Sequence, residues 1–395
     1  MRGINGVMKK ALGDMEFTAG GGAINWFPGH MAAAIRAIRH RLKLADMVIE
    51  VRDSRIPLSS ANQDLQPHLS SKRRVIALNK KDLANSNIMN KWVDFFDSCN
   101  QDCIPINAHS KSSVRKLLEL VEFKLKEAIS REPTLLVMVV GVPNVGKSAL
   151  INSIHQIASE RFPVQEKRKR ATVGPLPGVT QDIAGYKVIA HQPSIYVLDT
   201  PGVLVPSIQD TETGLKLALA GSVKDEVVGE ERIAQYLLAV LNSRRTPLHW
   251  RRHLNNRRME GIQYEPEERH RFNLNDLQPK RRALPNKSDA VYVEDLVTEV
   301  QCALYTTLSE FDGNVEDENG LESLIEVQFE ALQKAMKVSH MAAEARLRVS
   351  KKLLTLFRAV NIGGKLLALC NRELEICSTA PRAHVCIRNG ALNFH

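Results

Sequence analysis

The sequence predicts an α/β fold, in which a mostly parallel sheet is flanked by helices, followed by a smaller α-helical C-terminal domain. First, an apolar run at 135–140, a glycine-rich turn and a helical stretch at 149–154 are typical of a strand, a loop and a helix. Second, short apolar strands alternate with helical segments, at 46–51, 74–78, around 104 and at 195–198. Third, the regular apolar patterns after residue 211 have the spacing of helices and not of strands.

The first half of the chain supplies the elements of the sheet in order. Residues 28–44 predict a helix, because Met31, Ile35, Ile38 and Leu42 recur at helical spacing. The cations on its other sides suit either a solvated face or contact with a phosphate backbone. Further helices are expected at 88–97 and 113–128, where apolar residues again repeat at helical spacing.

The second half predicts helices at 212–220, 231–241, 290–308 and 321–336. Arginine pairs lie among Trp250, Tyr264 and Phe272 between 244 and 285, which suits phosphate binding with aromatic stacking or a linker broken by prolines. The expected domains are an N-terminal extension at 1–25, an α/β domain at 26–205, a helical domain at 206–360 that includes the basic linker 244–285, and an irregular tail at 361–395.

The glycine-rich turn follows the pattern G-x-x-x-x-G-K-[ST] from Gly141 to Ser148. Its backbone N–H groups can surround phosphates, and the helix that follows adds its positive end. Lys147 is expected to bridge the outer phosphates and Ser148 to ligate Mg²⁺. The expected phosphate contacts are Asn144, Val145, Gly146, Lys147, Ser148 and Ala149. A plain glycine turn with a chance lysine is the alternative.

A second motif, Asn79-Lys80-Lys81-Asp82, follows the strand at 74–78. A carboxylate at Asp82 can accept hydrogen bonds from N1–H and the 2-amino group of guanine, which adenine lacks. A buried Asp82 left unpaired would cost about 2 kcal/mol or more, so guanine is preferred. Asn79 is expected to tie this loop to the phosphate loop, and the Lys80 stem to lie along the base. A solvated polar turn is the alternative.

Three further segments complete the expected site. Asp199 would hold Mg²⁺ through water, and the N–H of Gly202 would meet the γ-phosphate. Thr180, in a segment rich in proline and glycine, is the candidate switch threonine for Mg²⁺. The backbone N–H of Ala108 would read guanine O6, although a plain strand-to-loop transition also fits there. Val203 follows Gly202 and cannot orient a water molecule, because its side chain has no hydrogen-bonding group.

The base-reading elements precede the phosphate loop, which is the reverse of the order in Ras-type proteins. A closed sheet of this kind tolerates such a circular permutation, because its termini lie near each other at the surface. The motif at 199–202 then runs directly into the C-terminal domain. A signal from the γ-phosphate is therefore expected to pass to that domain.

Together with this order, two motifs carry a family resemblance: Trp26-Phe27-Pro28-Gly29-His30-Met31 and Asp53-Ser54-Arg55. The chain resembles the circularly permuted ribosome biogenesis GTPase A family, in its mitochondrial ribosome-associated GTPase 1 and plant mitochondrial DAR GTPase type. Similarity covers the first 245 residues well, the next hundred less well and the final 35 not at all. Ser54 departs from the family's Asp-Ala-Arg. From the residues alone, Asp53 and Arg55 could orient a switch or simply pair with each other.

The resemblance implies a GTPase that binds GTP, GDP and Mg²⁺ and acts in assembly of the mitochondrial large ribosomal subunit, contacting rRNA and ribosomal proteins. It makes His30 the candidate catalytic residue, although a helix-start histidine is the alternative. In related GTPases, the residue at Asn144 accompanies K⁺, but this side chain could instead satisfy loop backbone. Hydrolysis is expected to be slow alone and stimulated by the subunit. A monomer is expected, and peripheral association with the inner membrane is left open. An RNA-binding or ribosome-binding module with negligible turnover is the alternative function.

Composition agrees with this reading. The 395 residues carry 54 Lys and Arg against 44 Asp and Glu, and this net charge of +10 favours a polyanionic partner. The cations at 167–170 suit either solvent or RNA. Six scattered cysteines without a C-x-x-C pair indicate thiols in a reducing compartment. No apolar run is long enough to cross a bilayer. Residues 1–25 match a transit peptide poorly, so a mitochondrial location rests on the resemblance.

Overall fold

The computed structural model describes residues 24–25, 29–84, 86–129, 134–161, 184–189, 194–203, 207–208, 210–251, 254, 287–339 and 344–359. The described chain divides into two compact units. One covers Ile24–Gln209 and Lys216–Lys224, and the other covers Asp210–Leu215 and Asp225–Gly363. The boundary between them therefore runs through helix α7 (Thr211–Leu219).

The first unit is built on a six-stranded sheet in the order β4-β3-β2-β5-β7-β6. Its strands are β2 (Met47–Asp53), β3 (Arg73–Asn79), β4 (Asp102–Pro105), β5 (Thr134–Val140), β6 (Ala184–Ile189) and β7 (Ser194–Asp199). All neighbours pair in parallel except β6 and β7. This confirms the mostly parallel sheet. It also confirms the permuted order, because β2, β3 and β4 precede the phosphate-loop strand β5 in the chain and lie in the same sheet with it.

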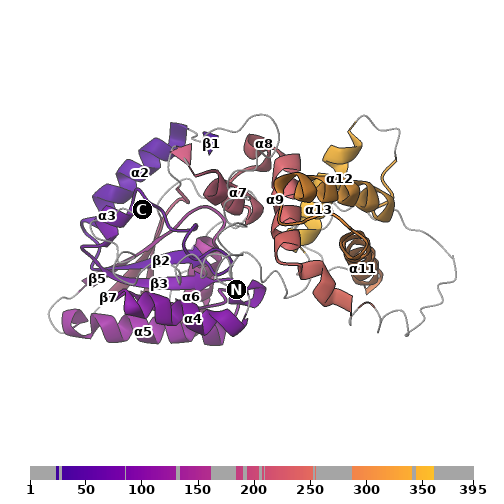
Figure 1. Ribbon diagram of the computed structural model, residues 1–395. Helices are drawn as coiled ribbons and strands as arrows, with labels where there is room; N and C mark the ends of the chain where they lie inside the picture. Colours follow the sequence, from indigo (N-terminus) through magenta and orange to yellow (C-terminus); the bar gives the residue numbers. More distant parts are fainter. Residues whose placement is uncertain are drawn as a thin grey trace. The chain divides into compact units, whose positions relative to one another are not determined.

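Apolar helix faces cover the sheet. Helix α2 (Gly29–Leu42) and the short α3 (Gln66–Leu69) share a buried cluster with β2 and β5, in which Ile38, Leu65 and Val48 are fully enclosed. Helix α4 (Ser86–Ser98) packs Trp92 against Ile76 and Leu78 of β3. Helix α5 (Lys111–Ile129) packs on α6 (Lys147–Arg161) and lies on the opposite side of the sheet from α2 and α3 (Figure 1).

Several elements were absent from the sequence prediction. The antiparallel edge strand β6 and helix α3 were not expected, and neither was the two-stranded pair of β1 (Ile24–Asn25) with β8 (Ser207–Ile208). In that pair Ile24 aligns with Ile208. It therefore joins the start of the described chain to the segment that follows β7.

The second unit is helical, as predicted. It contains α8 (Asp225–Val228), α9 (Glu230–Ser243), η2 (Thr246–Trp250), α11 (Lys287–Ser309), α12 (Glu318–Ala335) and α13 (Ala345–Ala359), the last of which the sequence analysis did not name. Helix α13 packs on α9, and α11 packs on α12 and η2. Trp250 is only 3% exposed, so its ring packs in this unit and is not available for the aromatic stacking that was one of the two alternatives for residues 244–285.

Two polar pairs fix this helical packing. Asn242 and Gln328 are completely buried and exchange two amide hydrogen bonds of 2.8 and 2.9 Å. Arg358 forms a two-pronged ion pair with Asp225, at 2.7 and 2.8 Å, which ties the end of α13 to the start of α8. Because buried amides without partners are costly, the reciprocal pair favours one alignment of α9 and α12.

A buried charge network occupies the middle of the sheet. Glu50 is 1% exposed and accepts hydrogen bonds from Arg52, Arg74 and Gln66 at 2.9 to 3.1 Å. Burial would raise the pKa of Glu50, but the two guanidinium groups hold that pKa below its ordinary value. Arg52 also lies over the ring of Phe96, 5.4 Å from its centroid. The network thus joins β2, β3, α3 and α4.

Further features of the described residues concern membrane spans, cysteines and metal-binding groups. No described helix is long and apolar enough to cross a membrane. Cys99, Cys103 and Cys302 form no disulfide. Burial raises the pKa of the Cys103 thiol to about 12, so it stays protonated. Within the described ranges, no group of three His, Cys, Asp or Glu side chains is arranged to hold a metal ion.

We predict that Glu50→Gln lowers the free energy of unfolding at pH 7 by about 3 kcal/mol, because it leaves two buried arginines without their carboxylate. The pKa of Glu50 is lowered by folding, so the charged pair stabilises the protein above the unfolded pKa of about 4. That stabilisation is lost as the pH falls further. Urea unfolding between pH 7 and pH 3 should therefore show the two proteins converging.

The control is Glu119→Gln on the exposed side of α5, which should change stability by less than about 0.5 kcal/mol. A constant difference between Glu50→Gln and the parent protein down to pH 3 would contradict the role assigned to this carboxylate.

Candidate functional site

Four parallel strands end at one edge of the sheet and bring the predicted motifs together. β2 ends at Asp53, β3 ends at Asn79, β5 leads into the turn at Gly141, and β7 ends at Asp199. In register, Asp53 aligns with Asn79, and Met138 aligns with Leu198. Segments that lie far apart in the sequence therefore meet where open α/β sheets bind their ligands.

The phosphate-loop pattern folds as a turn that leads into α6. Asn144 has a φ of 58° and Gly146 has a φ of 95°, so the backbone turns through conformations that glycine and asparagine favour. Val142 and Val145 are buried, which anchors the loop in the core. Consecutive N–H groups in such a turn, followed by a helix N-terminus, provide an anion-binding surface.

The charged groups at this turn are largely enclosed. Lys147 is 5% exposed, and its Nζ donates to the carbonyl of Val142 at 2.8 Å. Burial lowers the pKa of Lys147 to about 8, although the nearby Asp199 carboxylate opposes that shift. Burial likewise raises the pKa of Asp199, against the effect of Lys147. Each charge lacks the solvation it would have in water, so a phosphate and a cation would both be bound favourably here.

The oxygen atoms beside Lys147 suit a hard divalent cation. Ser148 Oγ lies 3.4 Å from Asp199 Oδ2. The other carboxylate oxygen, Oδ1, is buried and has no hydrogen-bond partner among the described residues. A carboxylate and a hydroxyl next to a phosphate-binding turn are the ligand types that Mg²⁺ takes. The residues present therefore fit the expected Mg²⁺ site.

Gly202 lies directly against the phosphate loop. A Cβ at this position would be 2.6 Å from the Cα of Pro143 and 3.0 Å from Lys147 Nζ, so only glycine fits without displacing backbone. Val203, the next residue, is fully buried in the cluster of α2, α3 and β5. Its carbonyl accepts a hydrogen bond of 2.6 Å from Asn62. Val203 is therefore part of the hydrophobic core beside this site.

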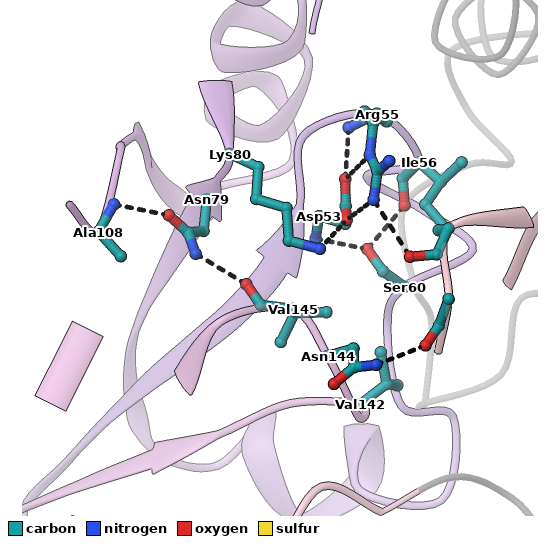
Figure 2. A network of polar contacts seen from close by, with 12 residues as sticks. Asp53, Arg55, Ile56, Ser60, Asn79, Lys80, Ala108, Val142, Asn144 and Val145 are labelled. Carbon is teal, nitrogen blue, oxygen red and sulfur yellow. Dashed lines mark hydrogen bonds and ion pairs between the residues drawn. The ribbon is translucent and has the colours of Figure 1, made fainter. Parts of the chain in front are cut away.

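The side chain of Asn79 joins the second motif to the phosphate loop, as predicted. Its Nδ2 donates to the carbonyl of Val145 at 2.8 Å, and its Oδ1 accepts from the N–H of Ala108 at 2.9 Å (Figure 2). Asn79 is 3% exposed. The lysine-bearing turn and the loop that begins at Asn79 are thus fixed to each other through one buried amide.

Two expectations about base recognition need correction. Asp82 was expected to be buried, but it is exposed, because the short η1 helix (Lys81–Leu83) sets it at the tip of the loop beyond β3. The N–H of Ala108, expected to read O6, donates to Asn79 instead. The estimated penalty for an unpaired Asp82 therefore applies only when a base covers that carboxylate.

The Lys80 side chain is directed toward β2. Lys80 has a left-handed backbone, with φ of 64°, and its Nζ lies 2.9 Å from Asp53 Oδ2. Burial lowers the pKa of Lys80, and the Asp53 carboxylate opposes that shift. Its stem is partly buried beside this edge of the sheet. The sequence analysis did not anticipate this ion pair.

Asp53 and Arg55 pair with each other, which was one of the two alternatives left open by the sequence. Asp53 is fully buried and accepts from the backbone N–H, Nε and Nη2 of Arg55, at 2.8 to 3.0 Å. Burial would raise the pKa of Asp53, but Arg55 and Lys80 hold that pKa well below its usual range. Ser54 continues the strand pairing, because its N–H donates to the carbonyl of Asn79 at 2.8 Å.

A turn that no motif marks also reaches this site. The guanidinium of Arg55 donates to the carbonyl of Ala220 at 3.2 Å, and Asn144 Nδ2 donates to the carbonyl of Gly221 at 2.7 Å. For Asn144 this supports the alternative that its side chain forms a hydrogen bond with a backbone carbonyl. Backbone carbonyls accept hydrogen bonds whatever residue carries them, so sequence alone gave no signal for these contacts.

Some predicted residues lie at or beyond the limits of the description. Thr180 and the cations at 167–170 fall outside the described residues, as do Tyr264, Phe272 and the tail at 361–395. His30 belongs to the first turn of α2, but its side chain is outside the described part. The helix that carries it packs Ile35 and Ile38 in one cluster with Val203.

Comparison with known proteins agrees with this arrangement. A family model described as 50S ribosome-binding GTPase matches residues 136–270. Short integuments 2, mitochondrial, from Arabidopsis thaliana is 69% identical over 361 residues, which are 90% of this chain and 92% of the relative. DAR GTPase 2, mitochondrial, from the same plant is 39% identical over 345 residues, which are 86% and 88% of the two chains.

A bacterial relative extends the similarity. Ribosome biogenesis GTPase A from Bacillus cereus is 35% identical over 222 residues, which are 54% of this chain and 70% of the relative. The permuted strand order, the joined phosphate and Asn79 loops and these relatives agree with one another. This chain therefore belongs to the circularly permuted ribosome biogenesis GTPase A family, in the branch of the mitochondrial DAR GTPases.

Proposed function

We propose that this mitochondrial GTPase hydrolyses GTP slowly by itself and faster on the large ribosomal subunit, whose assembly it serves. Membership of the family makes it a GTP-hydrolysing enzyme that uses guanine nucleotide and Mg²⁺. The proposal is carried by the buried amide of Asn79, which joins the base-reading loop to the phosphate loop. One nucleotide can therefore contact both loops at once.

The phosphate side of the proposed site centres on Lys147. Its ammonium group would leave the carbonyl of Val142 for the β- and γ-phosphates, and the loop N–H groups from Asn144 to Ala149 would surround them. Ser148, Asp199 and Thr180 would hold Mg²⁺, directly or through water. The ion supplies positive charge where negative charge develops in the transition state. The N–H of Gly202 would contact the γ-phosphate, which the close packing on Pro143 supports.

The guanine side centres on Asp82. An exposed carboxylate beyond β3 can close on N1–H and the 2-amino group once the base lies between it and the Lys80 stem. Ala108 would contact O6 only if its N–H turned from Asn79 or was shared with it. Because the Asp53 carboxylate fixes the end of the Lys80 side chain, the stem would offer a preformed apolar surface to the base.

Catalysis is assigned to His30. An imidazole near neutral pH can orient a water molecule or accept its proton, whereas the side chain of Val203 can do neither. Two contacts support this assignment. β1, which precedes His30 in the chain, pairs with β8, and Ile35 and Ile38, which follow it on α2, share a buried cluster with Val203.

The proposed partner is the large ribosomal subunit, through rRNA and ribosomal proteins. Relatives are named for ribosome biogenesis, and the net charge of +10 favours a polyanionic surface. Within the described residues, Arg36 and Arg39 are exposed on α2 and Lys43 is exposed directly after it, and these cations suit phosphate contacts. The proposal includes a monomer, K⁺ beside Asn144 as a second cation and peripheral association with the inner membrane.

A nucleotide-stabilised RNA or ribosome-binding module with negligible turnover is the second candidate. The burial of Val203 favours it, because the usual position of the water-orienting residue carries no catalytic group.

Single-turnover GTP hydrolysis should separate the two candidates. We expect slow hydrolysis by the protein alone and a rise of at least tenfold with large-subunit particles in K⁺, because the subunit would order the catalytic group. Na⁺ in place of K⁺ should lower the stimulated rate. If the particles produce no stimulation in either salt, the binding module is the better description.

We predict that Asp82→Asn weakens GTP binding about 30-fold, the equivalent of roughly 2 kcal/mol. It should strengthen binding of xanthosine triphosphate, because an amide can donate to the 2-oxo group. Titration with both fluorescent nucleotides measures the change. Asp97→Asn, at an exposed position near the end of α4, is the control and should alter neither affinity. An unchanged base preference in Asp82→Asn would refute the assignment.

We predict that His30→Ala retains GTP binding and loses subunit-stimulated turnover by about 100-fold, the contribution typical of a general base. Single-turnover rates with and without particles test this. The control is His68→Ala, at an exposed position on α3, which should keep the full stimulated rate. Equal stimulated rates in His30→Ala and the parent protein would remove His30 from the mechanism.

A further inference from the structure

Four segments at the nucleotide edge are joined in a closed ring of hydrogen bonds. Asp53 binds Arg55 and Lys80, and Arg55 continues to the carbonyl of Ala220. From the adjacent Gly221 the ring returns through Asn144, at 2.7 Å, to the phosphate loop. The carbonyl of Val145 and the side chain of Asn79 then close the ring on the residue before Lys80 (Figure 2).

The turn in this ring is well defined in its own right. It ends α7, with hydrogen bonds from the N–H of Gly221 to Ala218 and from the N–H of Ser222 to Leu217, both at 2.8 Å. Gly221 has a φ of 81°, a conformation that glycine adopts without strain. The turn is followed in the chain by Lys224 and then by α8.

The two anchors of the turn come from opposite sides of the proposed nucleotide. Arg55 belongs to the Asp53 group, which holds the Lys80 stem on the base side. Asn144 belongs to the phosphate loop. Both anchors donate to neighbouring carbonyls of one short turn. Anything that fixes Lys80 and Asn144 together therefore restrains the carbonyls of Ala220 and Gly221.

We propose that Asp53 and Arg55 are positioning residues that act through Lys80 on guanine recognition and through Ala220 on the turn after α7. Nucleotide binding then reduces the mobility of residues 216–224, through contacts on the base side as well as on the phosphate side. This inference rests on the proposed binding of guanine nucleotide. It differs from a γ-phosphate switch, because GDP alone is sufficient to engage Lys80 and Asn144.

Among the described residues, the other buried ion pair on β2, between Arg52 and Glu50, has no contact with the phosphate loop or with the turn after α7. Arg52 pairs with Glu50 at 2.9 Å and is as well buried as Arg55. Arg52 contacts Glu50, the carbonyl of Pro57 and the ring of Phe96, and none of these belongs to the phosphate loop or to the turn. Arg52 therefore offers a matched control for the loss of a buried guanidinium.

The test is hydrogen exchange of the full-length protein with and without GDP and Mg²⁺, followed by mass spectrometry of two peptides, 141–152 and 216–224. We expect GDP to slow exchange about tenfold in both peptides of the parent protein. In Arg55→Lys the ammonium can pair with Asp53 but cannot also reach Ala220, since it lacks the planar fork. Protection of 216–224 should fall to about twofold or less, while 141–152 stays protected.

Each result decides between explanations. Arg52→Gln should keep the GDP-linked protection of 216–224 even if its overall stability is lower. Protection of 141–152 without protection of 216–224 in the parent protein would overturn the inference and leave the proposed function intact. Undiminished protection of 216–224 in Arg55→Lys would also overturn it. Protection of neither peptide would instead refute nucleotide binding itself.

Discussion

The nucleotide edge of this protein depends on one buried amide. Asn79 donates to the phosphate loop with its nitrogen and accepts from Ala108 with its oxygen, so a single planar group sets the spacing of three segments. A buried amide without partners is costly, and both of its ends are satisfied here. Because Asn79 stands at the end of β3, the sheet itself determines where that amide lies. The remaining contacts of the site, from Lys80 to Gly202, are arranged around this fixed distance.

The permutation changes the order in which the chain connects the strands, but the same residues still meet at the edge of the sheet. Parallel strands place their last residues at one edge of the sheet in any chain order, so β2, β3, β5 and β7 assemble the site although β2 and β3 precede the phosphate-loop strand β5 in the chain. In the chain, the segment after Asp199 continues into α7 and the turn at Ala220. The hydrogen bonds from Arg55 and Asn144 hold that turn to the two loops. The turn therefore belongs to the unit of the sheet, and the chain continues from it into α8.

Sequence patterns predicted the elements that bury an apolar face and the motifs with fixed spacing. The core strands and the long helices follow from periodicity, and the contact from Asn79 to the phosphate loop follows from its motif. β6, α3 and the β1–β8 pair were missed because they are short or lie at an edge, where tertiary contacts override local preference. The exposure of Asp82 and the ion pair from Lys80 to Asp53 depend on loop geometry beyond the strand ends. Carbonyl contacts of Ala220 and Gly221 carry no residue signature at all.

The central claim is that one guanine nucleotide spans the loop of Asp82 and the loop of Lys147. Calorimetric titration with GDP and with inosine diphosphate, which lacks only the 2-amino group, tests it most directly. The account predicts that GDP binds at least about tenfold more tightly, because only guanine satisfies both oxygens of the Asp82 carboxylate. Equal affinities for the two diphosphates would contradict it, since the base would then lie away from Asp82 while the phosphates alone held the ligand.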